Sequence, residues 1–525
     1  MATSQQPVSN RTVVVACAIG VGLLYTAQAS HWSLLADDAF ISFRYADHVA
    51  QLGELAYNAG ERVEGYSNLL WVLVLAALSA AGASPASAAP LVGYLVGLAT
   101  LWMTYWSATR VLGCSRGAAW GALLWMATSI SWSFWTVAGM ESALFSLLLV
   151  GLWAACWSER ASRPSGALLT GALSGLLAIT RPEGVACGLL VPLVLGGLRR
   201  LRLRLWLGAT LVAAASVAAL LVWRHVYYGA WWPNSVHAKV ALTSATLVRG
   251  AAYLWSFLWD ELVIVLLPLL VLARRRDARF VTLLLVLLGY AAFIVLVGGD
   301  GLYRYRFPAH LVPLLAIGFA AGLERTLTLP RHLKWPIGVA ASLATITALL
   351  RPGFFREFTL LEVRQWEQRW TLVGKALAEH TPPDVTVATN VAGRVPYFSE
   401  RRTLDLLGLN DRVIARAPVE DLGSGYAGHE RAAPDTVLAR HPDLIYFSVL
   451  DGLPRQAFRS QRVVCHVLGL GSLYRYVPLL ERADFRAQYR PAFVHLSDGT
   501  WANAFVREQR EAALEKDGVQ VESWL

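Results

Sequence analysis

The sequence predicts a polytopic α-helical membrane protein with a C-terminal soluble α/β domain. Of its 525 residues, 56% are hydrophobic and 16% charged, and its mean hydropathy is +0.45. Soluble proteins carry about a quarter charged residues. The deficit is uneven, because long uncharged runs fill residues 11–351 and charges come every few residues afterwards. This excludes a purely soluble enzyme, a disordered chain and a β-barrel. We therefore place the membrane domain in residues 1–351 and the soluble domain in residues 352–525.

The net charge of +10 belongs to the membrane half, since residues 351–525 contain 22 Lys+Arg and 22 Asp+Glu. Basic residues spread over short loops do not form the single surface that a nucleic acid needs, so we expect no nucleic-acid partner. The five cysteines show no metal-site or disulfide spacing, which predicts free thiols.

Eleven stretches approach the roughly 20 apolar residues that a spanning helix needs. They are residues 12–28, 88–109, 117–137, 142–158, 164–180, 184–198, 205–226, 257–273, 280–298, 307–323 and 335–350. The first stretch has an alternative interpretation as a cleaved signal peptide, because Ala27-Gln28-Ala29 fits a cleavage site. We favour an uncleaved helix, since only one Arg precedes it.

The positive-inside rule orients these stretches. With Arg199–Arg204 and Arg274–Arg276 inside, the other basic loops also fall inside when the spans alternate. The apolar run Leu69–Ala81 then cannot cross, and it should lie at the outer surface or dip in and return. The first outer loop, about residues 30–87, and the C-terminal domain are expected outside.

The soluble domain alternates helix and strand, which is typical of a small α/β domain. We expect helices at Phe355–His380 and Pro434–His441. The expected strands are Val385–Thr389, Leu404–Leu409, Leu444–Ser448, Val463–Leu468 and Phe493–Leu496.

Two adjacent carboxylates, Asp37 and Asp38, precede a predicted helix at Ala39–Leu52. One of them can cap the helix, which leaves the other unexplained. Partial desolvation and like-charge repulsion suit such a carboxylate to act as a general base. We favour Asp37 as the base and Asp38 as the cap, because Asp38 lies closer to the helix start. Alternatively, the pair shares the role or jointly holds a divalent cation.

Further ionisable residues fall at the outer ends of predicted spans, where charges are costly and are candidates for function. Each also has a structural alternative, such as an Arg181–Glu183 ion pair or a Lys239 or Arg306 side chain that snorkels. Gly65, in the first loop, allows another chain segment to approach closely. In the soluble domain, an isolated histidine is more often a surface residue than a ligand. The candidates are Arg44, Glu64, Tyr66, Glu141, Arg181, Glu183, His237, Lys239, Asp300, Arg304, Arg306 and His429.

No phosphate loop, dinucleotide fingerprint or His-Glu-x-x-His motif occurs, which argues against a soluble nucleotide as energy source. The segments Asp37–Tyr45 and Asn58–Asn68 resemble the first outer loop of GT-C superfamily glycosyltransferases, especially the mycobacterial terminal β-(1→2)-arabinofuranosyltransferase-like branch. Weaker similarities are Gly139–Glu141, Arg181–Gly184, Pro233–Lys239, Gly298–Asp300, Asp405–Asp411 and Gly428–Glu430. Relatives often have Trp-Met after Gly-Gly-Asp, where this chain has Gly301-Leu302.

The resemblance implies an inverting hexosyl- or pentosyltransferase in a bacterial inner membrane, with its active site facing the periplasm. Its donor would be a polyprenyl-phosphate sugar, and its acceptor a glycan, glycolipid or protein. Asp37 or Asp38 would be the base, and the first loop would hold two helices along the membrane. The cations available for the donor phosphate are Arg181, Lys239, Arg304 and Arg306. No cofactor is certain, although a divalent cation is possible. The alternatives are a lipid-linked sugar transporter or flippase and a non-catalytic envelope-assembly protein.

Overall fold

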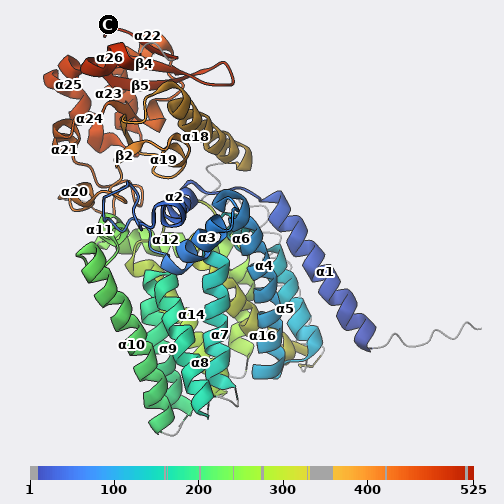
Figure 1. Cartoon of the computed structure of the whole chain (residues 1–525). Helices are drawn as coiled ribbons and strands as arrows, with labels where there is room; N and C mark the ends of the chain where they lie inside the picture. The colour runs from blue at the N-terminus through green and yellow to red at the C-terminus, as the bar shows by residue number, and fades with distance from the viewer. Residues whose placement is uncertain are drawn as a thin grey trace, which may run out of the picture.

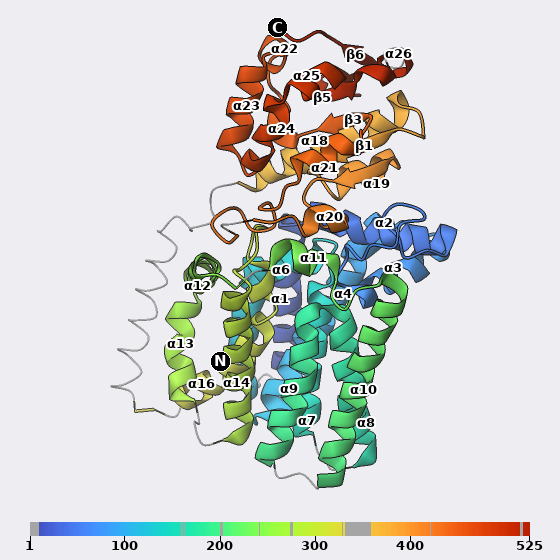
Figure 2. The same cartoon turned by 90° about the vertical axis from the view of Figure 1, so that its left-hand side faces the viewer.

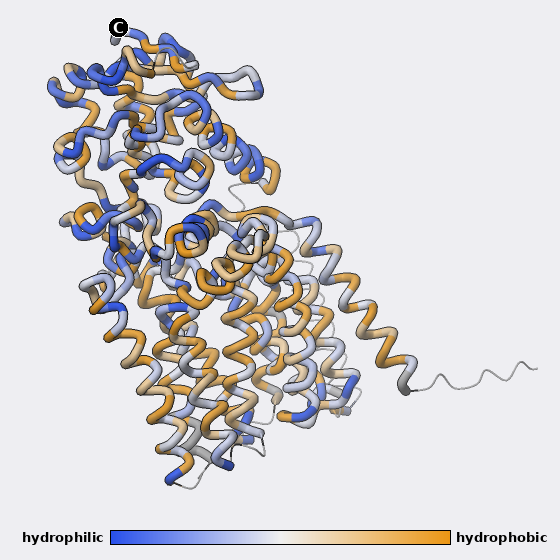
Figure 3. Tube along the Cα trace, in the orientation of Figure 1, coloured by the Kyte–Doolittle hydropathy of each residue, from blue (hydrophilic) through white to orange (hydrophobic). Residues whose placement is uncertain are grey.

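The computed structural model describes residues 10–158, 161, 163–199, 203–240, 242–273, 277–327, 329–330, 359–419, 422–514 and 518–525. In Figure 1 a bundle of apolar helices carries the soluble domain at one end, and the helices of the first loop lie between the two. Figure 3 shows the same division as hydropathy, with a hydrophobic bundle below a domain of mixed character. The expected boundary at residues 351/352 and the span at 335–350 lie outside the described residues.

Ten helices of the described residues make up most of the bundle. They are α1 (Asn10–His31), α4 (Pro85–Trp106), α5 (Arg116–Thr128), α7 (Ser142–Trp157), α8 (Pro164–Thr180), α9 (Pro182–Arg199), α10 (Leu203–Tyr228), α13 (Val263–Leu272), α14 (Ala278–Leu296) and α16 (Val312–Leu327).

Four stretches of the described chain are long and apolar enough to cross a membrane: Thr12–His31, Pro85–Val111, Leu203–Tyr228 and Ala278–Leu296. The chain is thus a multi-pass membrane protein. The prediction of eleven spans is not confirmed.

Two predicted spans differ from the observed helices. The stretch 117–137 is divided at Ser129, whose side chain accepts from the Trp132 N–H and so starts a separate helix, α6 (Ile130–Val137), bent by 113° from α7. The stretch 257–273 is divided at Leu262, whose φ of 59° ends α12 (Ser244–Asp260). The first break lies inside a largely apolar stretch, whereas the second directly follows the charged pair Asp260-Glu261.

Short helices cover the end of the bundle that carries the soluble domain (Figures 1 and 2). Besides α6 and α12 they are α2 (Asp37–Leu52), α3 (Leu69–Ala80), α11 (Asn234–Lys239) and α15 (Arg306–Ala309). The twelve residues of α3 extend only about 18 Å, against a hydrocarbon core of about 30 Å. Its length therefore agrees with the expectation that Leu69–Ala81 does not cross, and α2 and α3 are the two helices expected in the first loop.

The soluble domain contains one six-stranded mixed sheet in the order β2-β1-β3-β5-β4-β6. Its first three strands are parallel, and the other pairings are antiparallel. The strands are β1 (Thr386–Thr389), β2 (Arg402–Asp405), β3 (Leu444–Tyr446), β4 (Tyr489–His495), β5 (Trp501–Arg507) and β6 (Val519–Val521). The principal helices around it are α18 (Leu360–His380), α19 (Arg394–Ser399), α21 (Pro434–Ala439) and α23 (Gln461–Leu470). The expected α/β character is confirmed.

Some details of the soluble domain were predicted wrongly. The expected strand Val463–Leu468 is part of helix α23, which buries Val464 and Leu468. These residues are four apart and therefore lie on one helical face. The expected strand Leu404–Leu409 is displaced, because β2 ends at Asp405, and strands β5 and β6 were not foreseen.

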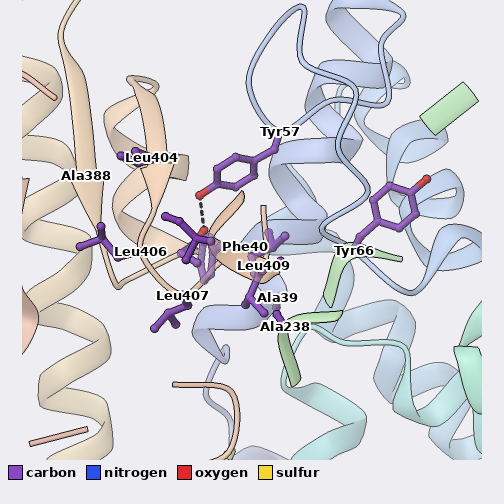
Figure 4. Packing of buried hydrophobic residues seen from close by; sticks show 14 of the residues in the cluster. Ala39, Phe40, Tyr57, Tyr66, Ala238, Ala388, Leu404, Leu406, Leu407 and Leu409 are labelled. Atoms are coloured by element: carbon purple, nitrogen blue, oxygen red, sulfur yellow. Dashed lines mark hydrogen bonds between the residues drawn. The ribbon is translucent and has the colours of Figure 1, made fainter. Parts of the chain in front are cut away.

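The two halves share one hydrophobic core. A single buried cluster includes Ala39 and Phe40 of α2 together with Leu406, Leu407 and Leu409 of the soluble domain, and Figure 4 shows these side chains side by side. The soluble domain is therefore docked on the first loop by burial of apolar surface, which is the dominant favourable contribution to such packing.

Candidate active site

The two adjacent carboxylates of the first loop face different partners. Asp37 is the first residue of α2, and both of its carboxylate oxygens accept backbone N–H groups at the start of α19 in the soluble domain. The Gly393 N–H lies 3.0 Å from Oδ2, and the Arg394 N–H lies 2.6 Å from Oδ1. Asp37 therefore joins the first loop to the soluble domain.

The predicted capping role is wrong for both carboxylates. The N-cap of α2 is Ala36, and no side chain caps this helix. Asp38 instead points towards two cations, with its Oδ2 3.3 Å from Arg306 Nη1 and 3.7 Å from Lys239 Nζ. Arg306 is held in turn by Asp300, whose Oδ2 lies 2.7 Å from Nε. Residues from the first loop, α11 and α15 thus meet at Asp38.

The surroundings give the two carboxyl groups opposite proton affinities. Burial, reinforced by the charges of Glu367 and Asp38, raises the pKa of Asp37 to about 8. Burial also acts to raise the pKa of Asp38, but Lys239 and Arg306 outweigh it and hold that pKa below its usual value. Asp38 is consequently the carboxylate that is ionised at neutral pH.

A cavity of about 310 Å³ at the end of the bundle next to the soluble domain is lined by Asp38 and its cations. Its apolar wall includes Ile41, Met140, Trp232, Val236, Phe293 and Phe307. Its polar wall includes Asp38, Arg181, Glu183, Lys239, Arg249, Asp300 and Arg306. We call it the bundle cavity. An apolar cavity with a few charged groups suits an amphiphile with an anionic head.

A buried ion network forms the floor of the bundle cavity. Arg181 pairs with both Glu141 and Glu183, and all three side chains are almost fully buried. Asn68 of the first loop donates to Glu141 at 2.6 Å and to the Ser42 hydroxyl at 3.0 Å. The predicted Arg181–Glu183 pair is confirmed, and its link through Asn68 fixes the helix that carries Asp38.

A second and larger cavity, of about 1140 Å³, lies between the first loop and the soluble domain. We call it the interdomain cavity. Its walls include Asp37, Asp38, Tyr303, Trp366, Trp370, Asn390, His429, Ser448 and Trp501. Among the described residues, Asp38 alone lines both cavities. A ligand in either cavity can therefore reach this carboxylate.

His429 lines the interdomain cavity close to Asp38 and is not the surface histidine that its isolated position in the sequence suggests. Burial, with the charge of Lys239, lowers its pKa to about 4, so the ring is neutral at pH 7. Its Nδ1 is buried without a hydrogen-bond partner among the described atoms.

Four other candidates lie outside both cavities. Arg44 donates to the carbonyl groups of Tyr57, Pro396 and Arg401 and so joins the two halves. Glu64 pairs with Arg224 at 2.6 Å. Arg304, expected at the donor phosphate, is placed over the ring of Trp32, 4.6 Å from its centroid. His237 is on α11 but does not line the cavity, unlike its neighbour Lys239.

Tyr66, unlike these four residues, lines a cavity, and Gly65 lies at a close approach of two chain segments. Tyr66 lines the bundle cavity, with its hydroxyl 3.0 Å from that of Tyr228. A Cβ atom on Gly65 would lie 1.8 Å from Asn410 Oδ1, which confirms the expected close approach at this glycine.

The sequence did not single out Glu367, Arg394 or Arg249. Glu367 pairs with Arg394 and accepts from the backbone N–H of Asp37, and Arg249 lines the bundle cavity and pairs with Glu430. Within the part of the chain that the structure describes, no three His, Cys, Asp or Glu side chains cluster as a metal ion would require. The positive charge beside Asp38 comes from Arg306 and Lys239.

Comparison with known proteins gives one family model and one curated relative. Residues 360–513, most of the soluble domain, match a family described as a domain of unknown function (DUF8728). The terminal β-(1→2)-arabinofuranosyltransferase of Mycobacterium tuberculosis is 27% identical over 273 residues, 47% of this chain. The match covers 42% of that relative, less than half of its length.

Two solved structures show some likeness in fold at low sequence identity. ArnT from Cupriavidus metallidurans, bound to undecaprenyl phosphate, gives a TM-score of 0.49 at 14% identity, over 76% of this chain and 86% of that one. The mycobacterial arabinofuranosyltransferase AftD gives 0.40 at 15% identity, over 84% and 35%. The expected resemblance to the mycobacterial terminal β-(1→2)-arabinofuranosyltransferase is confirmed by this curated relative.

Proposed function

We propose that this protein is an inverting glycosyltransferase that moves a sugar from a polyprenyl-phosphate donor to an extracytoplasmic acceptor, with Asp38 as the general base. The observation that carries the proposal is the position of Asp38, which lines both cavities. The bundle cavity would hold the donor, and the interdomain cavity would hold the acceptor. This assignment replaces the initial preference for Asp37.

The bundle cavity has the properties that a lipid phosphate requires. Its apolar wall suits the first isoprene units, which arrive from the bilayer. Arg306 and Lys239 suit the phosphate, because hydrogen bonds to charged groups are the stronger ones. Both cations face Asp38 in the structure, so they would be shared between the base and the donor.

The chemical step would be a single displacement. The acceptor hydroxyl forms the new C–O bond at the anomeric carbon, and its proton passes to Asp38. The bond from the anomeric carbon to the phosphate oxygen breaks, and its electrons leave on the polyprenyl phosphate. Attack on the face opposite the leaving group inverts the anomeric configuration.

Because Asp38 and the donor phosphate would share these two cations, the proton affinity of Asp38 would change during the reaction. In the absence of donor, Lys239 and Arg306 hold the pKa of Asp38 low, so the carboxylate is ionised and ready. When negative charge develops on the leaving phosphate, the cations are attracted to it and stabilise Asp38 less. Its proton affinity then rises during transfer, as a base requires.

Paired substitutions test this proposal. Asp38→Asn should lower the transfer rate about 10²–10⁴-fold, the usual cost of removing a general base. Asp37→Asn is the matched comparison. It replaces one of the two oxygens that accept backbone N–H groups by an NH2 group that cannot accept, so we expect a loss of activity that is much smaller than in Asp38→Asn. The measurement is transfer from synthetic polyprenyl-phosphate sugars, beginning with a pentose, by the purified protein in nanodiscs.

The outcomes of these and two further measurements distinguish the alternatives. An Asp38→Asn variant with normal transfer would end the proposal, and loss of activity only in Asp37→Asn would return the role of base to Asp37. An EDTA-treated sample tests the divalent cation, because full activity is expected if Arg306 and Lys239 supply the positive charge. Movement of intact lipid-linked sugar across liposomes without transfer would instead identify a flippase.

A further inference from the structure

The wall of the interdomain cavity that faces away from the membrane is built by the soluble domain. Trp366 and Trp370 are one turn apart on α18, and Trp501 begins β5. Trp366 is 39% exposed although its ring is large and apolar. Trp370 and Trp501 are half-buried. Tryptophans that remain partly accessible in one cavity are typical of a binding surface.

Ion pairs fix this wall. Arg369 binds both oxygens of Asp451, at 2.7 and 3.0 Å, and donates to the Trp501 carbonyl at 2.6 Å. The side chain of Asn390 donates to the Ser448 hydroxyl at 2.8 Å and accepts from the Ser448 N–H at 2.9 Å. These contacts join α18 to the loops after β1, β3 and β4, so the tryptophans stand on a rigid support.

The charges of the cavity are already compensated. Among its described residues, Asp451 pairs with Arg369, Glu367 pairs with Arg394, and Asp37 accepts backbone N–H groups. Asp38, which also lines this cavity, pairs with Arg306 and Lys239. The other polar groups that the soluble domain contributes include the neutral side chains of Asn390, Ser448, Ser472 and Thr500. A charged ligand would find no unpaired opposite charge on this wall. The hydroxyl groups of a neutral ligand could instead form hydrogen bonds with these neutral side chains.

A carbohydrate chain has the complementary chemistry. The C–H faces of sugar rings pack on aromatic rings, and their hydroxyls bond to neutral polar side chains. The volume of about 1140 Å³ exceeds the roughly 300–1,000 Å³ of pockets for drug-sized ligands, so several sugar units would fit. The cavity reaches Asp38 at its inner end.

We propose that the soluble domain is the acceptor-binding part of this protein, and that Trp366, Trp370 and Trp501 form subsites for consecutive units of a neutral glycan chain whose terminal hydroxyl lies at Asp38. This inference rests on the proposed function for its direction, because Asp38 defines the reacting end. It names the acceptor as a glycan chain rather than a peptide. The chain is attached either to a polysaccharide or to a glycolipid.

Binding to the full-length protein in nanodiscs tests the inference without requiring catalysis. The probes are fluorescently labelled neutral oligosaccharides of one to six pentose or hexose units, followed by fluorescence polarisation. Affinity should rise with chain length, and Trp366→Ala and Trp501→Ala should each weaken binding of the longest chains about three- to tenfold. Trp366→Phe should restore part of the loss, and Leu361→Ala, on the same helix outside the cavity, should change nothing.

The outcomes separate this inference from the transferase proposal. Binding is measured apart from transfer, so a wild-type protein that binds the oligosaccharides but never transfers a sugar would refute the transferase proposal alone. Competition by the same glycan on a lipid, stronger than by the free glycan, identifies a glycolipid. If no oligosaccharide binds, if the tryptophan variants bind as well as the wild type, or if neutral peptides bind instead, the acceptor inference is overturned.

Discussion

The two cavities that meet at Asp38 hold their charges for different purposes. In the bundle cavity, Arg306 and Lys239 face Asp38 at 3.3 and 3.7 Å, and the Lys239 side chain is 29% exposed. In the interdomain cavity, Arg369 and Arg394 are tied closely to Asp451 and Glu367. Lys239 and the Nη1 atom of Arg306 can exchange Asp38 for another anion while Asp300 continues to hold Arg306 Nε at 2.7 Å. The second pair of cations supports the walls.

This difference shows why burial of charge does not by itself indicate function. An ion pair that is satisfied on all sides gains little from a ligand, because the ligand would have to replace good hydrogen bonds. The longer contacts of Arg306 Nη1 and Lys239 Nζ to Asp38, at 3.3 and 3.7 Å, can be replaced by contacts to a phosphate at lower cost. The predictions below test this distinction, beginning with the largest effect.

The largest effect in the bundle cavity is expected at Arg306. Arg306→Ala should lower kcat/KM for the donor about 10- to 100-fold, because a hydrogen bond to a charged group contributes about 1.5–3 kcal/mol. Lys239→Ala should cost less, since its ammonium is more distant from Asp38 and more exposed. Steady-state kinetics with varied donor measure both.

Arg304→Ala is the matched control, because this side chain stacks on Trp32 outside the cavity. It should leave the donor KM unchanged. Equal losses of donor use in Arg304→Ala and Arg306→Ala would mean that the effect does not depend on whether the cation lies in the bundle cavity.

The second effect concerns the joint between the two cavities. A Cβ atom on Gly393 would lie 1.8 Å from the Asp37 carbonyl oxygen, so Gly393→Ala must push α19 away from α2. Overpacking of this kind costs about 1–3 kcal/mol. We expect transfer to fall about tenfold while the bundle stays folded, together with faster proteolysis of the soluble domain.

Gly469→Ala provides the control, because its added Cβ would meet only Val477 Cγ2 at an ordinary 3.6 Å. Unchanged activity and protease resistance in Gly393→Ala would show that Asp37 and α19 do not hold the two cavities together.

The sequence predicted the set of charged residues better than their roles. Asp38, Arg181, Glu183, Lys239, Asp300 and Arg306 do meet around one cavity, because charge at membrane depth is costly and persists where partners exist. The choice between Asp37 and Asp38 was not predictable. It depends on Gly393, which is 356 residues away from Asp37 and contacts it only in the folded chain.

The fold, like the site, could be predicted only in part from the sequence. Long apolar runs predicted the bundle and the change in charge density predicted the soluble domain. The break at Leu262 rests on one left-handed residue directly after Asp260-Glu261, within a stretch that is long enough to span. Val463–Leu468 reads as a strand by its β-branched residues, but burial of Val464 and Leu468 selects a helix. Tertiary packing decided both cases.

The smallest effect expected is the pH dependence, and it distinguishes the two carboxylates without any loss of fold. A base works only when deprotonated, so activity falls as the pH drops below its pKa. The pKa of Asp38 is held low by Lys239 and Arg306 against the effect of burial, which predicts a flat kcat/KM from pH 8 down to about pH 5. With Asp37 as the base, activity would already decline below pH 8.

The pH dependence of stability, unlike that of activity, should report on Asp37. Because the pKa of Asp37 rises from 3.8 to about 8 on folding, the native state holds a proton that the unfolded state releases between these values. The contribution of Asp37 to stability is therefore complete below pH 3.8 and is lost as the pH rises through 8. Protease resistance of the soluble domain should decline from pH 6 to pH 9 in the wild type and less in Asp37→Asn, while the flat activity profile below pH 8 is the same in both. A steeper decline in Asp37→Asn would place the titrating group elsewhere.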